Sequence, residues 1–576
     1  MTARTGAVTL PPWSTDPAAA GGPPPALGDL LAAPARKWPE RVAIDDGATR
    51  YTFAELERGA LRIAGWLAGQ GVGPGDRVAV LTETKPVMPM IILGIWKRGA
   101  VHVPLDSAEP GHRTLDLLRR VRPAAVITPR GAPDPLPGTP TLDGEGLVPL
   151  LSGPGADGEG PVPRTSGPGA DGQGPVPHTS GPGAPHTTLA HGPEDTAYIV
   201  FASGATGVPQ GAEITAAGLL AHFTGHNEVL RLTPDSRVLG LSPFHFDVSL
   251  LDTLLPLSVG ASVHQYRGLP VPALLRAAVA RHGITHLLAV TVLLDLFTRD
   301  ARQITREKLP SLEVVMTGAQ VCPSAVLRVW AEQVPGVRLV QAFGPPEATI
   351  FGFTHTVRPE ETAGEDPCPV GRPLRGTLAR LVRDGAEVHG PGAEGELWIG
   401  GPQVMRGYFD QPEETARLVV EADGTRWFRT GDVCAYDADG ALVLRRHADE
   451  RIVWLAGRRT HLHEIERAAL SFPGVERATA TAVPRGGRDV VALVVAAKER
   501  RNLPDVTEHL RDRLPEPLRP ALLGWNRPSP APWEPDRAGS ALASRIGAAT
   551  AGPPHATYFE LSADGAVEPF DDEVEI

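Results

Sequence analysis

The sequence predicts a mixed α/β protein, with a large, multi-layered N-terminal α/β domain and a small C-terminal α+β domain. The chain has 576 residues, more than one ordinary domain holds, so two or three domains are expected. Short apolar runs alternate with amphipathic stretches over most of the chain, an exchange of strand and helix periods that is typical of α/β layers. The alternation ends near Leu444, where a different order of elements begins.

Residues 1–40 are expected to form a flexible arm. The stretch MTARTGAVTLPPWSTDPAAAGGPPP is rich in proline and has no continuous apolar run, so it fits neither a signal peptide nor a membrane span. The large domain is then predicted over residues 41–446. Its first elements are VAI, YTFAELERGALRIAGWLAGQG, RVAVLT, MIILGIWKRG and AVHVPL, in which strand and helix signals take turns.

A repeat interrupts this domain, and residues 133–192 are predicted to be a disordered insertion. SGPGADGEGPVPRT at 152–165 is followed by SGPGADGQGPVPHT at 166–179. Gly, Pro and Ser dominate, so little apolar surface could be buried to offset the entropy lost on ordering the chain. A tandem duplication inside a surface loop is favoured over a repeat that binds a partner.

The small domain is predicted over residues 447–545. LHEIERAALSF has the period of a helix, VERATATAVPRG and DVVALVVAAKE have the composition of strands, and LPDVTEHLRDRL reads as a second amphipathic helix. Residues 546–576 end in several acidic residues and are expected to be an exposed acidic tail.

Composition limits the partners of the chain. Acidic residues outnumber basic ones by 67 to 55 and there is no long basic run, so neither nucleic acid nor a membrane surface is an expected partner. The three cysteines, Cys322, Cys368 and Cys434, have no paired metal-ligand spacing, which disfavours structural zinc and a disulfide framework. These features indicate a cytoplasmic protein that binds a small molecule.

SGATGVPQG, residues 203–211, follows the apolar run AYIVFA and has the composition of a phosphate-binding loop. Gly204 and Gly207 would let backbone N–H groups approach phosphate oxygens, while Ser203 and Thr206 offer hydroxyl donors. Gln210 stands where such loops usually carry lysine. Glycine-rich turns after strands are common, so the loop alone leaves an ordinary turn as an alternative.

Further motifs occur in a fixed order along the chain: YTFAELE, GIWKRGAVHVPLDSAEPGHR, FDVSLLDTLLPLSVGASV, QAFGPPEATI, GELWIGGPQVMRGYFDQPEET, FRTGDVCAYDADG and GRRTHLHEIE. With them the sequence resembles the adenylate-forming superfamily of acyl-CoA synthetases, luciferases and nonribosomal peptide adenylation domains, and it is most similar to the last. The resemblance covers roughly residues 40–540, apart from the repeat. It implies an active site at the interface of the two domains.

The resemblance implies ATP and Mg²⁺ as cofactors. Glu347 matches the family's Mg²⁺-binding glutamate, a role that suits a hard carboxylate ligand. Asp432 matches the residue that accepts both ribose hydroxyls, and Arg446 the hinge arginine that adds a donor to the ribose. The implied nucleotide-binding residues are Ser203, Gly204, Thr206, Gly207, Gln210, Gly344, Asp432 and Arg446, with Thr206 and Glu347 also counted as catalytic.

Asp247 lies where adenylation domains for α-amino acids place an aspartate against the substrate ammonium. A carboxylate among Phe246, Val248 and Leu250 needs a cation to be tolerated, so the residue itself predicts an amine. Matching the motifs gives the rest of the pocket as Val248, Leu251, Leu288, Val315, Thr317, Ala342, Ile350 and Phe351. This lining is apolar except for Thr317, so an amino acid with a small or medium apolar side chain is expected.

The chain departs from the family where catalytic cations are expected. The last family loop, of the type Asn-Gly-Lys-x-Asp-Arg, is matched by PWEPDR, which puts Glu534 in the place of the catalytic lysine. A lysine about 4 Å from the reacting anion contributes about 4 kcal/mol at an effective dielectric of about 20. Its loss predicts adenylation slower by about a thousandfold. Gln210 in the place of a lysine, and Pro346 where the family favours threonine, are also expected to slow adenylation.

Three functions follow from these observations. The first is amino acid adenylation with ATP, followed by transfer of the acyl group to the thiol of a separate carrier protein or to an amine, in natural-product biosynthesis. The second is a degenerate homologue that binds amino acid or nucleotide as a scaffold without adenylating. The third is ATP-independent acyl transfer or amide formation on the same fold. Family resemblance alone leaves the choice open.

Overall fold

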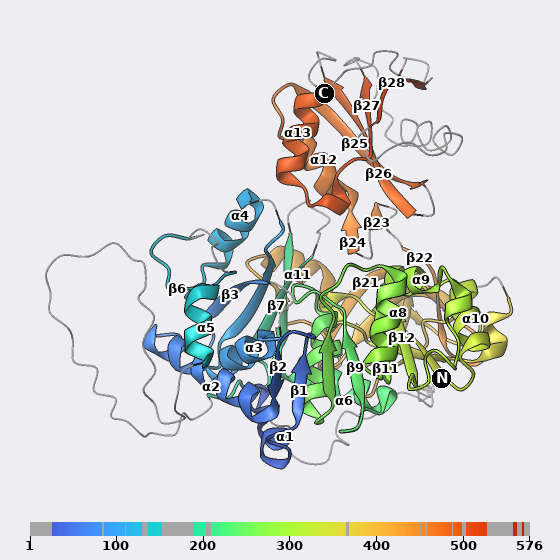
Figure 1. The fold of residues 1–576 in the computed structure, drawn as a ribbon. Helices are drawn as coiled ribbons and strands as arrows, with labels where there is room; N and C mark the ends of the chain where they lie inside the picture. The colour runs from blue at the N-terminus through green and yellow to red at the C-terminus, as the bar shows by residue number, and fades with distance from the viewer. Residues whose placement is uncertain are drawn as a thin grey trace, which may run out of the picture. The chain divides into compact units, whose positions relative to one another are not determined.

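The computed structural model describes residues 26–82, 86–109, 111–129, 136–152, 189–202, 209–364, 368–447, 449, 451–455, 458–485, 488–497, 503–526, 557–561 and 567–569. The chain divides into two compact units, with the boundary between Ala448 and Asp449 and with the short segments 108–117 and 201–210 counted in the second unit. Figure 1 shows the mixed α/β character of the larger unit and the α+β character of the smaller one, as the sequence predicts.

A nine-stranded sheet forms one layer of the larger unit. Its order is β15-β14-β13-β12-β11-β9-β10-β1-β2, and the strands from β13 to β1 run parallel while the outer strands are antiparallel. The bounds are Val42–Asp45 (β1), Arg50–Thr52 (β2), Arg237–Gly240 (β9), Ser262–Gln265 (β10), His286–Val290 (β11), Val314–Gly318 (β12), Arg338–Phe343 (β13), Phe353–Val357 (β14) and Arg372–Pro373 (β15). Helices α8 (Pro272–Arg281), α9 (Thr291–Thr298) and α10 (Ser324–Gln333) lie beside it (Figure 1).

A seven-stranded sheet has the order β19-β8-β7-β4-β3-β5-β6. Its strands are Arg77–Thr82 (β3), Val101–Asp106 (β4), Ala125–Ile127 (β5), Thr141–Leu142 (β6), Thr196–Ala202 (β7), Gln210–Thr215 (β8) and Gly407–Tyr408 (β19). The helices between and beside these strands are α1 (Ala32–Lys37), α2 (Phe53–Gly69), α3 (Met88–Lys97), α4 (Gly111–Val121), α5 (Gly144–Ser152), α6 (Ala216–Leu230) and α7 (Leu255–Ser258). Helix α2 is capped at its N-terminus by Thr52, which forms a capping box with Glu55.

A third sheet of the larger unit is antiparallel. It contains β16 (Leu378–Arg383), β17 (Ala386–Val388), β18 (Glu394–Gly400), β20 (Val419–Ala422), β21 (Thr425–Tyr436) and β22 (Leu442–His447), and α11 (Pro412–Leu418) precedes β20. β22 pairs with β21, so that His447 lies opposite Asp432. The side chains of Leu381, Leu397 and Ile399 form the inner face of this sheet.

The smaller unit contains the hairpin of β23 (Ile452–Leu455) and β24 (Arg458–His461) and a five-stranded sheet with α12 (Leu462–Leu470) and α13 (Leu503–Arg513). The sheet is built from β25 (Val475–Arg485), β26 (Arg488–Ala497), β27 (Leu522–Asn526), β28 (Thr557–Leu561) and β29 (Val567–Pro569). The expectation of a tail over 546–576 is therefore wrong for these two last strands. β28 pairs in parallel with β27, so its backbone groups find hydrogen-bond partners there. The acidic composition of residues 546–576 does not predict this strand.

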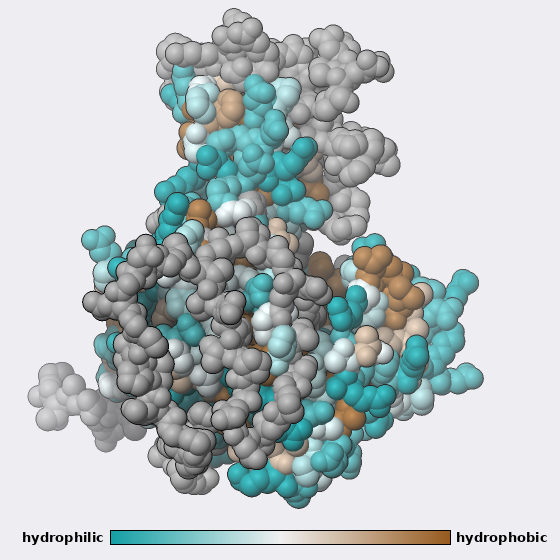
Figure 2. Space-filling view, turned by 60° about the vertical axis from the view of Figure 1, so that its left-hand side comes forward, coloured by the Kyte–Doolittle hydropathy of each residue, from teal (hydrophilic) through white to brown (hydrophobic). Residues whose placement is uncertain are grey.

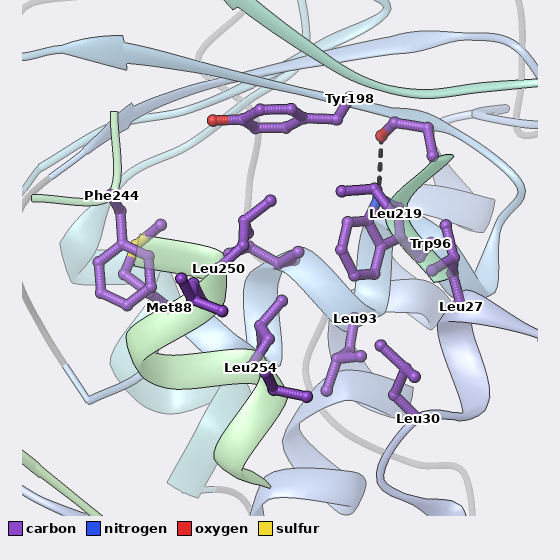
Figure 3. Close-up of a cluster of buried hydrophobic side chains, with 14 of the residues drawn as sticks. Leu27, Leu30, Met88, Leu93, Trp96, Tyr198, Leu219, Phe244, Leu250 and Leu254 are labelled. Atoms are coloured by element: carbon purple, nitrogen blue, oxygen red, sulfur yellow. Dashed lines mark hydrogen bonds between the residues drawn. The ribbon is translucent and has the colours of Figure 1, made fainter. Parts of the chain in front are cut away.

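The main core of the larger unit gathers side chains from helices and from both large sheets. Figure 3 shows Trp96 of α3, Leu219 of α6, and Leu250 and Leu254 packed together, with the Trp96 indole donating a hydrogen bond of 2.9 Å to the Ala197 carbonyl. Helix α3 is buried on every side, which explains why its sequence is apolar with little polar face. A second cluster lies between the nine-stranded sheet and α8, α9 and α10.

The structure also corrects the extent of the predicted insertion. Residues 136–152, placed in the disordered segment 133–192, contain β6 and α5. Leu147 is buried, and Leu150 and Leu151 pack against the main core, so this part has the apolar residues that ordering requires. The two repeat copies themselves fall almost entirely outside the described residues.

Hydrophilic side chains cover most of the described surface in the view of Figure 2, and hydrophobic ones form small patches. Among the described helices none is long and apolar enough to cross a membrane. The three cysteines are buried and unpaired with one another.

Candidate active site

The segment that carries Asp247 follows the carboxyl end of β9. Its shape is held by Asp252, a fully buried carboxylate that accepts hydrogen bonds from the Ser242 and Leu241 amides at 2.9 and 3.1 Å. Residues Leu250–Leu254 continue it as a π-helical turn. Such turns are rare and occur frequently at functional sites.

The Asp247 carboxyl is in an unfavourable place for a negative charge. Desolvation raises its pKa from 3.8 to about 7, and the charge of Glu347 adds to the shift. The phenol of Tyr198 is affected in turn, because burial and the Asp247 charge raise its pKa well above the usual value. The Tyr198 hydroxyl has no hydrogen-bond partner among the described residues. This surrounding favours a cation, such as an ammonium group, beside Asp247.

Glu347 lies in a strained loop. It belongs to a 3₁₀ turn over Pro346–Ala348, and the next two residues, Thr349 and Ile350, have φ values of 57° and 68°. Left-handed backbone at two successive β-branched residues is costly and is found mostly where function requires it. Gly344 allows this path, because a Cβ there would come within 2.6 Å of the Gly352 nitrogen.

The Glu347 carboxylate is 4% exposed, and the two oxygens differ. Oε1 accepts a hydrogen bond of 2.7 Å from the Tyr408 hydroxyl. Oε2 is buried, and no group in the described part of the chain donates to it. A buried carboxylate oxygen with unused lone pairs is a suitable ligand for a hard cation such as Mg²⁺.

Asp432 is the cross-strand neighbour of His447 on β21 and β22, and the two side chains are in contact. Arg446 is the cross-strand neighbour of Val433 instead, and since side chains alternate along a strand it faces away from Asp432. Its guanidinium lies 3.9 Å from Glu394, and its side chain is 63% exposed. The prediction that Arg446 and Asp432 both contact the ribose therefore stays a prediction, and the two side chains lie on opposite faces of the sheet.

The apolar residues predicted for the substrate pocket divide between two sides of the nine-stranded sheet. All the apolar ones except Val315 belong to the main core, namely Val248, Leu251, Leu288, Ala342, Ile350 and Phe351. Val315 belongs to the second cluster, and the hydroxyl of Thr317 lies 3.2 Å from that of Thr291 at the start of α9. Met316, between them, lies on the side of Leu288 and Ala342.

Most of the predicted phosphate loop, and the loop that carries Glu534, fall outside the described part of the chain. Ser203, Gly204, Thr206, Gly207 and Glu534 lie outside the described residues. Gln210 is described at the start of β8, where its side chain is 6% exposed and its Nε2 has no hydrogen-bond partner among the described residues.

Tyr408, His447 and Met316 are site neighbours that the sequence argument does not assign. Tyr408 stands in the motif GELWIGGPQVMRGYFDQPEET, whose order along the chain suggests a role but not which side chain performs it. His447 follows Arg446 directly, and only the strand register shows which of the two faces Asp432.

Comparison with known families gives a match to the model of the AMP-binding enzyme over residues 31–409. A second model, the Baseplate J-like central domain, matches residues 462–521 of the smaller unit. The first match includes Asp247 and Glu347 and ends before Asp432.

Curated relatives include the L-proline--[L-prolyl-carrier protein] ligase of Streptomyces coelicolor, 30% identical over 81% of this chain and 87% of that protein. The phosphinothricin tripeptide synthetase PhsC of Streptomyces viridochromogenes is 31% identical over 86% of this chain. CymA of Salinispora arenicola, named as a nonribosomal peptide synthetase, is 32% identical over 82% of it. The chain spans 43% of PhsC and 6% of CymA, so it matches only a part of either synthetase.

Solved structures agree with this assignment. IdnL1 is 25% identical, with a TM-score of 0.72 over 89% of this chain and all of that one. PA1221, a protein with adenylation and PCP domains, has a TM-score of 0.73 at 23% identity over 90% of this chain and 84% of that one, a likeness of fold. With the family model covering most of the larger unit, the chain belongs to the AMP-binding, adenylate-forming enzyme family, and its relatives include nonribosomal peptide synthetases.

Proposed function

We propose that this chain is an ATP-dependent ligase that activates an α-amino acid as its aminoacyl-AMP. The observation that carries the proposal is the pair Asp247 and Glu347, two neighbouring acids that each require a cation. The substrate ammonium satisfies the first and Mg²⁺ the second. The name of the Streptomyces coelicolor relative supports a ligase, and a carrier protein as the acceptor.

The substrate would bind with its ammonium on Asp247 and its side chain against the apolar residues of the same sheet face. Leu288, Ala342 and Phe351 lie on that face and are buried, so an apolar side chain of small or medium size is the best match. Val248, Leu251 and Ile350 complete the proposed lining, and Met316 takes the place proposed for Val315 and Thr317.

The nucleotide would be held by Asp432 at the ribose and by the loop 203–211 at the phosphates. His447, whose ring contacts the Asp432 carboxylate, would orient that carboxylate for the ribose hydroxyls. Glu347 Oε2 would hold Mg²⁺, which supplies charge neutralisation at the phosphates when bound. Gly344 would let the backbone approach the nucleotide closely. Arg446, near the end of β22, remains the proposed hinge arginine.

The reaction proceeds in two displacements. A carboxylate oxygen of the amino acid attacks the α-phosphorus of ATP, forming the acyl–phosphate bond as the bond to the β-phosphate breaks and pyrophosphate leaves. The thiolate of a carrier protein, or an amine, then attacks the carbonyl carbon and AMP leaves. The acceptor is proposed to be a separate chain, and the reaction to take place in the cytoplasm, where buried free cysteines remain reduced.

Glu534 and Gln210 favour a second candidate, a protein that binds amino acid or nucleotide without adenylating it. Each stands where the family carries a lysine that stabilises the anionic centre, and the loss of one such charge is worth about a thousandfold in rate. Transfer of an acyl group activated elsewhere, without ATP, is the corresponding catalytic variant.

Amino-acid-dependent exchange between ATP and pyrophosphate tests the proposal. We expect exchange with one or more apolar amino acids, lost in Asp247→Asn and increased by about a hundredfold or more in Glu534→Lys. Binding of ATP with Mg²⁺ by calorimetry, without exchange in either the wild type or Glu534→Lys, would instead establish the scaffold.

A further inference from the structure

Asp45, His264 and His282 form a cluster separate from the residues discussed above. Asp45 ends β1 and pairs in register with His264 of the parallel strand β10, and the His264 Nδ1 lies 2.6 Å from the Asp45 Oδ1. His282 caps the end of α8, and its ring stacks on that of His264 with centroids 3.4 Å apart. One nitrogen or oxygen atom from each residue lies within 4.8 Å of the others.

The cluster opens into a cavity of about 650 Å³. The walls are formed by the turn at 46–50, by Tyr266 and Arg267, and by Leu274 and Arg281 of α8. The carboxylate of Asp46 lies 2.7 Å from the Arg267 guanidinium, so this cation is already neutralised. Arg281 is exposed at the rim. Solvent and a small ion therefore have room to reach the two imidazoles.

The contact between Asp45 and His264 places a carboxylate oxygen and a ring nitrogen side by side, 2.6 Å apart. An ion that displaces the proton between them would bind Oδ1 of Asp45 and Nδ1 of His264 together. His264 is 8% exposed, so its ring is held in this orientation. The carboxylate of Asp45 and this imidazole are therefore two ligands that the sheet already holds next to each other.

We propose that Asp45, His264 and His282 bind a divalent transition-metal ion of the Zn²⁺ type. Two imidazoles and one carboxylate are the ligands of open zinc sites, in which water fills the remaining position, whereas Mg²⁺ and Ca²⁺ prefer oxygen alone. The ion would join β1 to β10 and to the end of α8, two elements that lie more than 200 residues further along the chain. The site shares no residue with the proposed adenylation site.

Binding requires a small rearrangement. Nitrogens about 2.1 Å from a tetrahedral ion lie about 3.4 Å from each other, so the ligands must approach and the two rings must leave their stacked arrangement. His282 is the residue able to move, because it is only partly buried and stands at the end of α8 before Gly283, whose φ is 59°. His264 and Asp45 keep their positions in the sheet.

Titration of the untagged full-length chain with Co²⁺ tests the proposal, because visible absorption reports the coordination of this ion. We expect one Co²⁺ per chain with the strong bands of four or five ligands, displaced by Zn²⁺. His282→Asn should weaken Zn²⁺ binding in calorimetry by about tenfold or more. The matched control is His355→Asn, whose imidazole is also partly buried and lies 2.9 Å from Glu361. It should bind as the wild type does.

Zn²⁺ should also raise the melting temperature of the wild type and of His355→Asn but not of His282→Asn or Asp45→Asn. Circular dichroism of each variant verifies the fold before titration, and the two substitutions remove different ligands, so failure of one to fold leaves the other. Absence of Co²⁺ binding by the wild type, or equal Zn²⁺ affinity in a folded ligand variant, would overturn the site. Neither measurement contains ATP or amino acid.

Discussion

Asp247 and Glu347 are single residues whose surroundings favour the binding of a cation. Their charges interact, and Asp247 has lost much of its contact with water. Glu347 has a hydrogen bond on one oxygen only. A buried charge is tolerated in proteins when a group of opposite charge lies beside it. Each carboxylate therefore predicts a cation that binds with the ligands, an ammonium group at Asp247 and Mg²⁺ at Glu347.

The raised pKa of Asp247 predicts a pH dependence of amino acid binding. The folded-state pKa of about 7 exceeds the ordinary 3.8, so the carboxylate form that an ammonium needs is lost as pH falls through about 7. Affinity for an apolar amino acid, measured by calorimetry, should fall by about tenfold per pH unit below that point. In Asp247→Asn the affinity should be weak and independent of pH. The same pH profile in both proteins would contradict the assignment.

The protonated Asp247 also contributes to stability, with the sign fixed by the same shift. Its contribution is present at low pH and is lost as pH rises through about 7. Asp247→Asn should therefore be more stable than the wild type at pH 8, and the difference should vanish near pH 4. Urea denaturation at the two pH values measures it.

The Tyr408 hydroxyl is expected to position Glu347 for Mg²⁺. Removing a hydrogen bond to a charged group costs about 1.5–3 kcal/mol, so Tyr408→Phe should reduce exchange between ATP and pyrophosphate by about ten- to a hundredfold. The loss should be recovered in part at high Mg²⁺, which separates positioning from a general loss of structure. Tyr51→Phe, at a partly buried tyrosine away from Glu347, is the control. A loss of activity that no Mg²⁺ concentration alters would argue for a purely structural role.

At the scale of the element, helices α2 and α3 approach each other closely through glycine. A Cβ added at Gly94 of α3 would lie 2.6 Å from the Ile63 Cβ and 2.9 Å from the Ala60 carbonyl oxygen of α2. Neither neighbour is the end of a flexible side chain. Interiors are packed without spare volume, so the helices would have to separate.

Gly94→Ala should therefore destabilise the larger unit by about 1–3 kcal/mol in spite of the better helix propensity of alanine. Gly69→Ala, near the end of α2 with no atom within 4 Å of the added Cβ, should be neutral or more stable by up to about 1 kcal/mol. Urea denaturation of the two variants checks both values. Equal effects would show that propensity, not packing, decides at Gly94.

For the whole molecule, the sequence predicts most of what repeats a pattern and little of what depends on register. The sequence predicts the α/β layers and the small α+β unit, and its ordered motifs give Asp247, Glu347 and Asp432 as candidate site residues. The motifs do not show that His447, and not Arg446, shares a face with Asp432, because one residue of register decides which face a side chain takes. The same one-residue difference in register puts Val315 on the opposite face of the nine-stranded sheet from Leu288.

Local composition misleads in two further places. Residues 136–152 precede a repeat that is poor in apolar residues, yet α5 carries enough leucine to pack on the core. β28 and β29 occur in a stretch that reads as an acidic tail, yet β28 pairs with β27 and β29 pairs with β28, a backbone pairing that their composition does not predict. Tertiary pairing of this kind overrides local preference.

Two fully buried histidines predict how the larger unit responds to acid. The imidazoles of His102 and His226 are 0% exposed, and desolvation lowers the pKa of each from 6.5 to about 3. Neither ring nitrogen of His102 has a hydrogen-bond partner in the described residues. The stability that a depressed pKa provides is present above the unfolded value of 6.5 and is lost as pH falls towards 3.

At pH 5 each such histidine costs about 2 kcal/mol relative to pH 8, since the unfolded chain gains a proton that the folded chain excludes. His102→Leu should therefore narrow the difference in unfolding free energy between pH 8 and pH 5 by about 2 kcal/mol. Urea denaturation followed by tryptophan fluorescence measures it, because Trp96 and Trp330 are fully buried in this unit. His389→Leu, whose side chain is 48% exposed, should leave the difference unchanged. If both variants keep the wild-type difference, His102 takes up a proton in the folded state and the acid sensitivity arises elsewhere.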